Sequence, residues 1–263
     1  MKTRTSLLVA ALAALSFSAY ADGPAVSSIN GKVSLEGGNY NHNGGQAIQA
    51  AIAAPIGNSF GLQLDTAFGG TDGKDFSGFG AHAFWRDPAR GLVGLTASAL
   101  RYDNFDVRRY GAEAEGYFGP FTLRGRAGYQ NSDWKDGAYY SLGARWYATQ
   151  DLMVSVSGEH AVNRNIGHVT AEWQVPSRSL PGLALFLDAA KGNKDFDMAI
   201  VGVRYYFGGN KSLIQRHRQD DPDNLLGDSL TSGQMQYQQR KDAAAAAAAA
   251  AANQCPPGSL LCV

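Results

Sequence analysis

Hydrophobic and polar residues alternate with a period of two between about residues 31 and 207. The segment from Phe60 to Phe68 reads FGLQLDTAF and places an aromatic, aliphatic or threonine side chain at every second position. Successive side chains of a β-strand point to opposite faces, so this segment predicts a strand with one apolar and one polar face. The same pattern recurs in residues 121–129, 140–146 and 169–175.

Twelve such segments follow one another along the chain, separated by short stretches rich in Gly, Pro, Asn, Asp and Ser that are typical of turns. A strand of ten residues tilted by about 40° rises about 25 Å, which is the height of the apolar band of a membrane barrel. An even number of antiparallel strands also returns the chain to the side where it started. The expected strands are 31–38, 46–56, 60–69, 76–86, 92–102, 107–118, 121–130, 138–147, 152–161, 166–175, 183–190 and 196–207.

Aromatic residues on the apolar face gather at the ends of these segments. Two aromatic bands with Leu, Val and Ala between them match the two interfaces of a bilayer, which a soluble β-sandwich has no reason to reproduce. The pattern therefore favours an all-β fold, a transmembrane antiparallel up-and-down β-barrel of about 12 strands. One band would hold Phe60, Trp85, Phe118, Phe121, Trp146, Trp173 and Phe207, and the other Phe68, Tyr110, Tyr129 and Tyr140.

Composition excludes two other classes of protein. The mean hydropathy of −0.24 is too low for a bundle of membrane helices. Lys and Arg together number 23, as do Asp and Glu, so the chain lacks the positive charge of a nucleic-acid-binding protein.

The first 21 residues have the pattern of a secretory signal peptide. Lys2 and Arg4 provide the positive charge, residues 7–15 (LLVAALAAL) the apolar stretch, and residues 19–21 (AYA) the cleavage site. The mature chain would begin at Asp22, and the barrel domain would comprise residues 22–207.

Residues 208–263 break the alternation and predict a low-complexity tail on the periplasmic side, with both chain termini on that side. The ten alanines 243–252 would form a helix of about 15 Å, too short to span a bilayer, or a linker. Cys255 and Cys262 flank a turn-forming Pro-Pro-Gly and could pair in an oxidising compartment. With no histidine nearby, they do not indicate a metal site.

The last predicted strand ends in Arg204-Tyr205-Tyr206-Phe207, an aromatic ending typical of barrel-closing strands. Together with the signal peptide and the two aromatic bands, it resembles the porin-like class of Gram-negative outer-membrane β-barrels over residues 22–207. The resemblance implies an outer-membrane location with lipid around the barrel. The chain departs from the class in one respect, because 56 residues follow Phe207 where the class ends at its terminal aromatic.

The polar face of such a barrel would line its lumen with acids and bases of opposite sign on neighbouring strands. These charges predict either a constriction that sorts solutes by charge or an ion-pair network that fills the interior. Glycines on the same face, such as Gly78 and Gly80, remove side-chain volume and favour a channel. The expected lumen residues are Lys32, Glu36, Gln49, Gln63, Asp65, His82, Arg86, Arg109, Glu113, Glu115, Arg124, Arg126, Arg145, Glu159, His168, Glu172, Asp188 and Arg204.

The favoured function is a channel for small polar solutes or ions that uses no cofactor and no metal. A second hypothesis is a structural or tethering barrel with a plugged lumen, whose tail contacts the cell wall or a periplasmic partner. A third is a lipid hydrolase, but Ser157 and His160 are three residues apart and would point to opposite faces of a strand. The charged cluster that could serve the second hypothesis comprises Lys211, Arg216, His217, Arg218, Asp220 and Asp221, but a solvated charge cluster also explains these residues and is the interpretation we favour.

Overall fold

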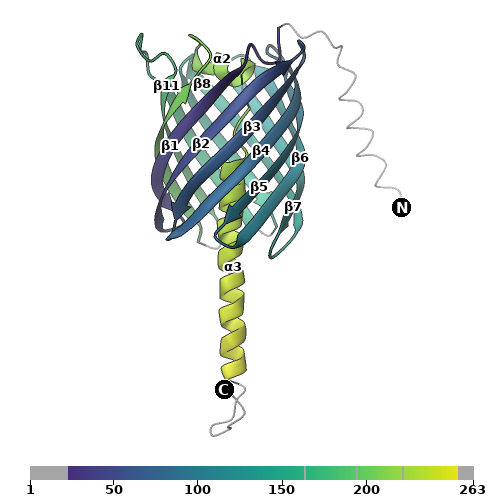
Figure 1. Cartoon of the computed structure of the whole chain (residues 1–263), viewed down its shortest axis with the longest axis vertical. Helices are drawn as coiled ribbons and strands as arrows, with labels where there is room; N and C mark the ends of the chain where they lie inside the picture. Colours follow the sequence, from purple (N-terminus) through teal and green to yellow (C-terminus); the bar gives the residue numbers. More distant parts are fainter. Residues whose placement is uncertain (1–22, 163, 194, 221, 254–263) are drawn as a thin grey trace, which may run out of the picture.

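The computed structural model describes residues 23–162, 164–193, 195–220 and 222–253. Twelve antiparallel strands form a closed barrel in which each strand pairs with its neighbours in sequence and β1 pairs with β12 (Figure 1). The predicted fold class is confirmed, and each predicted strand corresponds to an observed one. The strands are β1 Asn30–Tyr40, β2 Asn43–Ile56, β3 Phe60–Thr71, β4 Lys74–Asp87, β5 Gly91–Tyr102, β6 Phe105–Phe118, β7 Phe121–Ser132, β8 Gly137–Thr149, β9 Leu152–Ala161, β10 Arg164–Gln174, β11 Leu183–Gly192 and β12 Asp197–Tyr206.

Tight turns join the strands at the mouth that lies opposite Asn30 and Tyr206, the barrel's first and last residues. Asn41 and His42 connect β1 to β2 with φ of 52° and 66°, and Asp72 and Gly73 connect β3 to β4 with φ of 56° and 66°. Two successive residues with positive φ match the twist of a β-hairpin, which is why Asn, Asp and Gly recur there. Several strands extend one to three residues beyond their predicted ends toward these turns.

The outer surface of the barrel carries an exposed apolar band. Leu64, Leu95, Leu142 and Val201 are each at least 60% exposed, although each lies within a regular strand. Such a surface would be unfavourable in water and suits contact with lipid. Cross-strand pairs link the rim aromatics into bands, as the sequence predicts: Phe60 with Trp85, Phe118 with Phe121, Phe121 with Trp146, and Tyr110 with Tyr129.

Replacing Leu142 by Arg tests this assignment. Leu142 lies near the middle of β8 and is 71% exposed. We expect Leu142→Arg to destabilise the barrel in lipid vesicles by about 2–4 kcal/mol, because an arginine at the bilayer midplane is costly. Equilibrium urea unfolding in vesicles measures the change. Leu180→Arg is the matched control, because Leu180 is exposed in the loop between β10 and β11; equal effects of the two changes would contradict a lipid-facing band.

After β12 the chain turns back into the barrel. Gly208 and Gly209 have φ of 89° and 93°, and a Cβ at Gly208 would lie 2.8 Å from the Cβ of Asn30, so glycine suits this reversal. Helix α2 (Leu213–Gln219) then lies across the mouth near Asn30 and Tyr206 (Figure 1). Its first turn is fixed by the Gln215 side chain, which accepts a hydrogen bond of 3.0 Å from the Ser212 backbone N–H.

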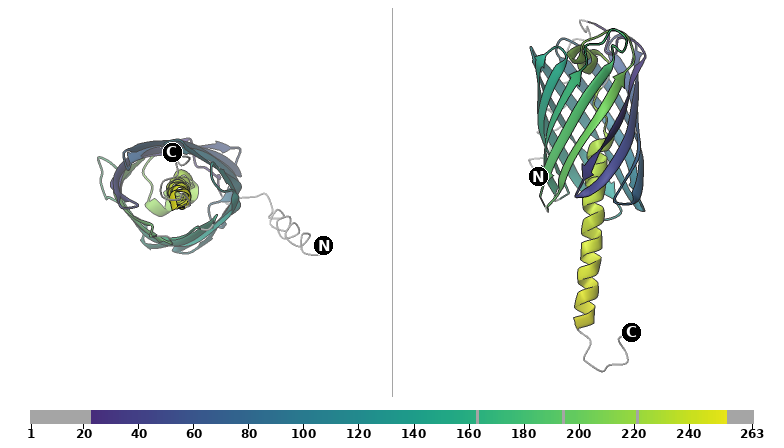
Figure 2. Two further views of the ribbon diagram at one scale, coloured as in Figure 1. Left: turned by 90° about the horizontal axis from the view of Figure 1, so that it is seen from below. Right: turned by 90° about the vertical axis from the view of Figure 1, so that its left-hand side faces the viewer.

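Helix α3 (Leu226–Asn253) begins inside the barrel and leaves through the opposite mouth (Figures 1 and 2). Inside, it packs against β3, β4, β5 and β6, where Leu226 and Leu230 contact a cluster that includes Phe76 and Leu100. Outside, the alanines 243–252 are exposed. Neither helix of the described chain is both long and apolar enough to cross a membrane.

This path differs from the predicted periplasmic tail in two respects. Residues 208–220 and 222–236, which we call the plug, lie at and inside the barrel, and α3 ends beyond the mouth opposite Asn30. The tail therefore does not lie wholly on the side where the barrel starts. The expected signal peptide (residues 1–21) and the expected Cys255–Cys262 disulfide fall outside the described residues.

Candidate functional site

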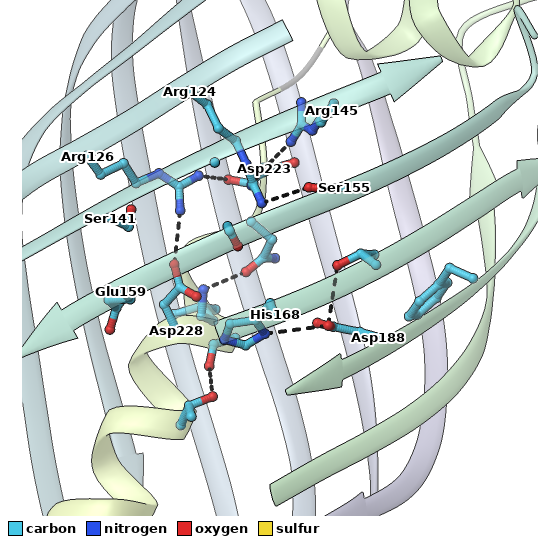
Figure 3. A pocket seen from close by; sticks show the side chains of 18 of the residues that line it. Arg124, Arg126, Ser141, Arg145, Ser155, Glu159, His168, Asp188, Asp223 and Asp228 are labelled. Carbon is cyan, nitrogen blue, oxygen red and sulfur yellow. Dashed lines mark hydrogen bonds and ion pairs between the residues drawn. The ribbon is translucent and has the colours of Figure 1, made fainter. Parts of the chain in front are cut away.

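The most highly charged part of the lumen is an arginine cluster that holds the plug. Arg124 on β7 and Arg145 on β8 both form ion pairs with the carboxylate of Asp223 (Figure 3). Arg126, two residues along β7, lies 3.3 Å from an Asp228 carboxylate oxygen and donates a second 3.3 Å hydrogen bond to the Asp223 carbonyl oxygen. Because alternate residues of a strand share a face, the spacing of Arg124 and Arg126 places both guanidinium groups in the lumen.

A buried polar chain on β3, β4 and β6 also holds the plug. Asp65 accepts a 3.0 Å hydrogen bond from the backbone N–H of Leu225, just before α3 begins. The same carboxylate lies 3.0 Å from Nε2 of His82, whose Nδ1 lies 2.7 Å from Glu113. Lys32 donates to the carbonyl oxygen of Pro222 at 3.0 Å. The segment between the two helices is therefore held from both sides of the lumen.

Small residues allow α3 to approach the wall closely. Ser229 and Ser98 place their hydroxyl oxygens 3.0 Å apart. A Cβ at Gly78 would lie 3.1 Å from a methyl carbon of Leu226, so the side-chain volume absent from the strand is occupied by the plug. The glycines that favoured an open channel in the sequence thus partly accommodate a helix.

Helix α2 packs across the mouth near Asn30 through buried contacts. The side chain of Arg216 is fully buried and donates to Gln174 at 2.9 Å and to the carbonyl oxygen of Gly209 at 2.8 Å. Leu213 is also fully buried and packs in a cluster with Tyr147 and Met153. The predicted solvated charge cluster is therefore wrong for Arg216, His217 and Asp220, which are all buried. Asp221 lies outside the described residues.

His217 is held between two tyrosines. Its Nδ1 lies 3.0 Å from the hydroxyl of Tyr147, and its Nε2 lies 3.0 Å from the hydroxyl of Tyr206. Tyr206 donates its proton to Glu172 at 2.6 Å, so it accepts a hydrogen bond from Nε2–H while Nδ1 accepts from Tyr147. This network uses a neutral ring. Burial, reinforced by the positive charge of Arg145, holds the pKa of His217 well below its usual range.

A cavity of about 190 Å³ remains beside the plug. The helix packs against the side of the lumen formed by β3–β6, and the cavity lies between it and the rest of the wall. Figure 3 shows side chains that line the cavity. Its lining is mostly polar and charged and includes His168 and Asp188, which lie 3.4 Å apart.

The structure places every predicted lumen residue on the inner side of the barrel or at its covered mouth. Eleven of the charged ones and Gln49 line the cavity: Glu36, Glu113, Glu115, Arg124, Arg126, Arg145, Glu159, His168, Glu172, Asp188 and Arg204. The others, Lys32, Gln63, Asp65, His82, Arg86 and Arg109, are buried away from it. Arg86 lies at the mouth near Asn30, where it donates to the Ala25 carbonyl oxygen at 3.2 Å.

The expected cross-strand ion pairs form only in part. Arg126 lies 3.5 Å from Glu113, its cross-strand neighbour on β6. Glu115 instead lies 3.6 Å from Arg145, and Arg124 turns to Asp223. Asp223 and Asp228 therefore complete the arginine cluster. They were missed in the sequence because their segment was assigned to the periplasm.

Nothing in the described chain assembles the alternative sites that the sequence raised. Ser157 faces the cavity, whereas His160 stacks on Tyr140 with ring centroids 5.1 Å apart, and Tyr140 is 55% exposed on the outer surface. Within the described residues, no group of three or more His, Cys, Asp or Glu side chains is arranged to hold a metal ion.

Neither known protein families nor curated proteins match this sequence. Solved structures do match the fold. A KdgM porin, crystallised in complex with disordered oligogalacturonate, superposes with a TM-score of 0.55 at 10% identity, covering 67% of this chain and 99% of the porin. An outer-membrane channel from Pseudomonas putida F1 superposes with a TM-score of 0.52 at 10% identity, covering 69% and 95%. The NanC porin gives 0.50 at 5% identity, covering 69% and 100%.

These similarities show that the chain has the fold of outer-membrane porin-like barrels. In each case about two thirds of this chain aligns with nearly the whole of the other protein.

Proposed function

We propose that this protein is an outer-membrane channel for small polar solutes whose lumen is closed by its own plug. The observation that carries the proposal is a charged lumen, enclosed by an apolar outer surface, in which a segment of the same chain is held by ion pairs and hydrogen bonds. The porin and channel structures that share the fold support it. Nothing in this reading requires a cofactor, a metal ion or a catalytic step.

Polar contacts suit a closure that opens. The plug also packs apolar side chains such as Leu226 and Leu230 against the wall, but its ion pairs lie in a polar lumen, where water, salt or solute can replace them. The cavity beside the plug already provides room for water. Planar-bilayer recording of the full chain tests the proposal, and the expected record shows long closed periods interrupted by discrete openings. A well-folded chain that stays silent over the whole range of voltage, salt and pH would contradict it.

The opening is expected to depend on pH through His217. Its pKa is lowered when α2 is docked, so docked α2 binds fewer protons than released α2 below about pH 6.5. Docking is fully favoured above that value and weakens as the pH falls through it. We therefore expect the open probability to rise as the pH is lowered from about 7.5 to 5.5. The groups that act on the ring are Tyr147, Tyr206, Glu172, Arg145, Asp223, Lys32 and Arg204.

Single-channel recording of His217→Gln separates this histidine from the other titrating groups, and the variant is expected to lose most of the rise. His42→Gln is the matched control, because His42 is half exposed at the opposite mouth, beside Asp195 and Asp197. A pH response that is the same in the wild type and in His217→Gln would show that α2 does not respond to pH.

The position of α3 changes the tethering hypothesis, because it determines on which side of the membrane the tail would contact a partner. If the mouth near Asn30 faces the periplasm, as the sequence predicts, then α3 projects from the cell surface and not toward the cell wall. The rim holds the emerging helix, because Tyr237 donates to Asp103 and Arg240 to Asn104, each at 3.0 Å. An Ala249→Cys variant, in which both native cysteines are serine, tests on which side α3 emerges. A membrane-impermeant thiol reagent applied to intact cells labels Ala249→Cys if α3 emerges at the cell surface and does not label it if α3 emerges in the periplasm.

A further inference from the structure

At one place in the lumen, the basic groups of the barrel wall outnumber its acidic groups, and the plug places a carboxylate there. Asp223 lies between Arg124 and Arg145, and Arg126 donates to its backbone carbonyl oxygen at 3.3 Å (Figure 3). The Arg145 and Arg126 side chains are 4% and 12% exposed, so their charges are largely removed from water. A carboxylate between two guanidinium groups is a strong and directional arrangement.

The barrel alone does not neutralise these arginines. Its own carboxylates in the cluster are Glu113, 3.5 Å from Arg126, and Glu115, 3.6 Å from Arg145. Across the described residues, Asp223 is the carboxylate that pairs with Arg124. Three guanidinium groups therefore face two carboxylates of the wall, and the plug supplies two more, Asp223 at Arg124 and Arg145 and Asp228 at Arg126. When the plug withdraws, this part of the lumen keeps one unneutralised positive charge.

The arginine cluster also borders free space. Arg124, Arg126 and Arg145 line the cavity of about 190 Å³, together with the hydroxyl side chains of Ser141 and Ser155. A water molecule takes up about 30 Å³ in the liquid, so the cavity has room for several non-hydrogen atoms beside the cluster even with the plug in place. A solute could thus reach the arginines before the plug has fully withdrawn.

We propose that Arg124, Arg126 and Arg145 form the solute-binding site of the channel, that the site selects small carboxylate-bearing solutes, and that Asp223 is a built-in competitor for it. This proposal rests on the proposed channel function. It follows that an acidic solute binds in place of Asp223 and thereby promotes opening, because a ligand that binds only the undocked state shifts the equilibrium toward that state. The arginine fork, being planar, suits a carboxylate better than a neutral hydroxyl group.

Gluconate and glucose are suitable probes, since they are similar in size and differ in charge. Isothermal calorimetry on the purified full chain is expected to show gluconate binding and no glucose binding. Asp223→Asn should bind gluconate about fiftyfold more tightly, because loss of the competing carboxylate raises the undocked fraction from about one per cent to about one half. Adding Arg124→Gln to that variant should abolish the gain. Arg108→Gln, which changes an exposed arginine on the outside of the barrel, is the control and should not alter binding.

The outcomes separate this proposal from the channel itself. Gluconate affinity that is unchanged by Asp223→Asn, or equal binding of glucose, overturns the carboxylate site even if the protein conducts. Phosphate that binds more tightly than gluconate overturns the carboxylate class. Gluconate binding with the expected variant pattern in a protein that never conducts supports the site and contradicts the proposed channel.

Discussion

A chain that ends at Phe207 is expected to conduct ions persistently, where the full chain opens rarely. The truncation removes α2, α3 and the segment between them, and leaves all twelve strands. The lost contacts include the buried Arg216 and the ion pairs of Asp223 and Asp228. Together we expect them to favour the closed state by at least about 3 kcal/mol, which keeps the open fraction below about one per cent. Truncation should therefore raise the mean current about a hundredfold.

Planar-bilayer recording at equal protein load measures this effect. A chain that ends at Lys241 is the matched control, because it lacks the exposed alanines but keeps the plug and the rim contacts of Tyr237 and Arg240. It should behave like the full chain. Heat-modifiable gel mobility verifies that each variant has folded. A folded barrel that ends at Phe207 and remains silent would show that the lumen does not conduct.

The second large effect is expected from one atom replacement in the plug. Asp223→Asn keeps the shape of the side chain but leaves Arg124 and Arg145 without their shared carboxylate. Breaking a buried ion pair by removing one partner costs about 3–5 kcal/mol, and because Asp223 is 29% exposed we expect a value near the lower end. A loss of about 3 kcal/mol corresponds to about a hundredfold change in the closed-to-open ratio.

Single-channel open probability measures the change, and Asp242→Asn is the control on the exposed part of α3. Asp242 accepts a 2.8 Å hydrogen bond from Gln238 and lies beyond the rim contacts, so its replacement should leave gating unchanged. High salt screens ion pairs, so it should raise the open probability of the wild type. The increase should be smaller in Asp223→Asn, because this variant already lacks the ion pairs of Asp223. Equal open probabilities in wild type and Asp223→Asn would show that the arginine cluster does not contribute to closing the lumen.

The strands could be predicted because the two faces of each strand meet opposite surroundings. Leu142 has to suit lipid, and Arg145, three residues further along β8, has to suit the lumen, so the period of two persists through all twelve strands. The turns could also be predicted, because Asn41, Asp72 and Gly73 belong to the few residue types that tolerate positive φ.

The plug could not be predicted by the same means. Its apolar contacts come from isolated side chains such as Leu226, Leu230 and Met235. Its other contacts are single polar ones whose partners lie about one hundred or more residues away, such as Asp223 with Arg124 and Leu225 with Asp65. Polarity of this kind is also typical of a solvated tail. One signal was present in the sequence: residues 227–233 (GDSLTSG) are mostly small, which allows a helix to fit inside a narrow barrel.

The lumen residues were predicted by face, but their pairing was not. Alternation places Glu115 and Arg124 opposite each other on β6 and β7, and the register confirms that position. Which acid neutralises which base depends on a third group that comes from elsewhere in the chain, here Asp223. A pairing deduced from neighbouring strands alone therefore omits the contact that closes the lumen.

Closure of the lumen by the plug depends most directly on α3 lying inside the barrel. Ser98 on β5 and Ser229 on α3, with hydroxyl oxygens 3.0 Å apart, are suited to replacement by a cysteine pair in a chain whose Cys255 and Cys262 are serine. The decisive measurement is oxidation of Ser98→Cys/Ser229→Cys in its native membrane, read as a mobility shift on a non-reducing gel. The account predicts a cross-link that reductant reverses, and none for Ser98→Cys/Ala243→Cys, whose partner lies about 21 Å further along the helix. A folded barrel in which Ser98→Cys and Ser229→Cys do not cross-link would contradict it.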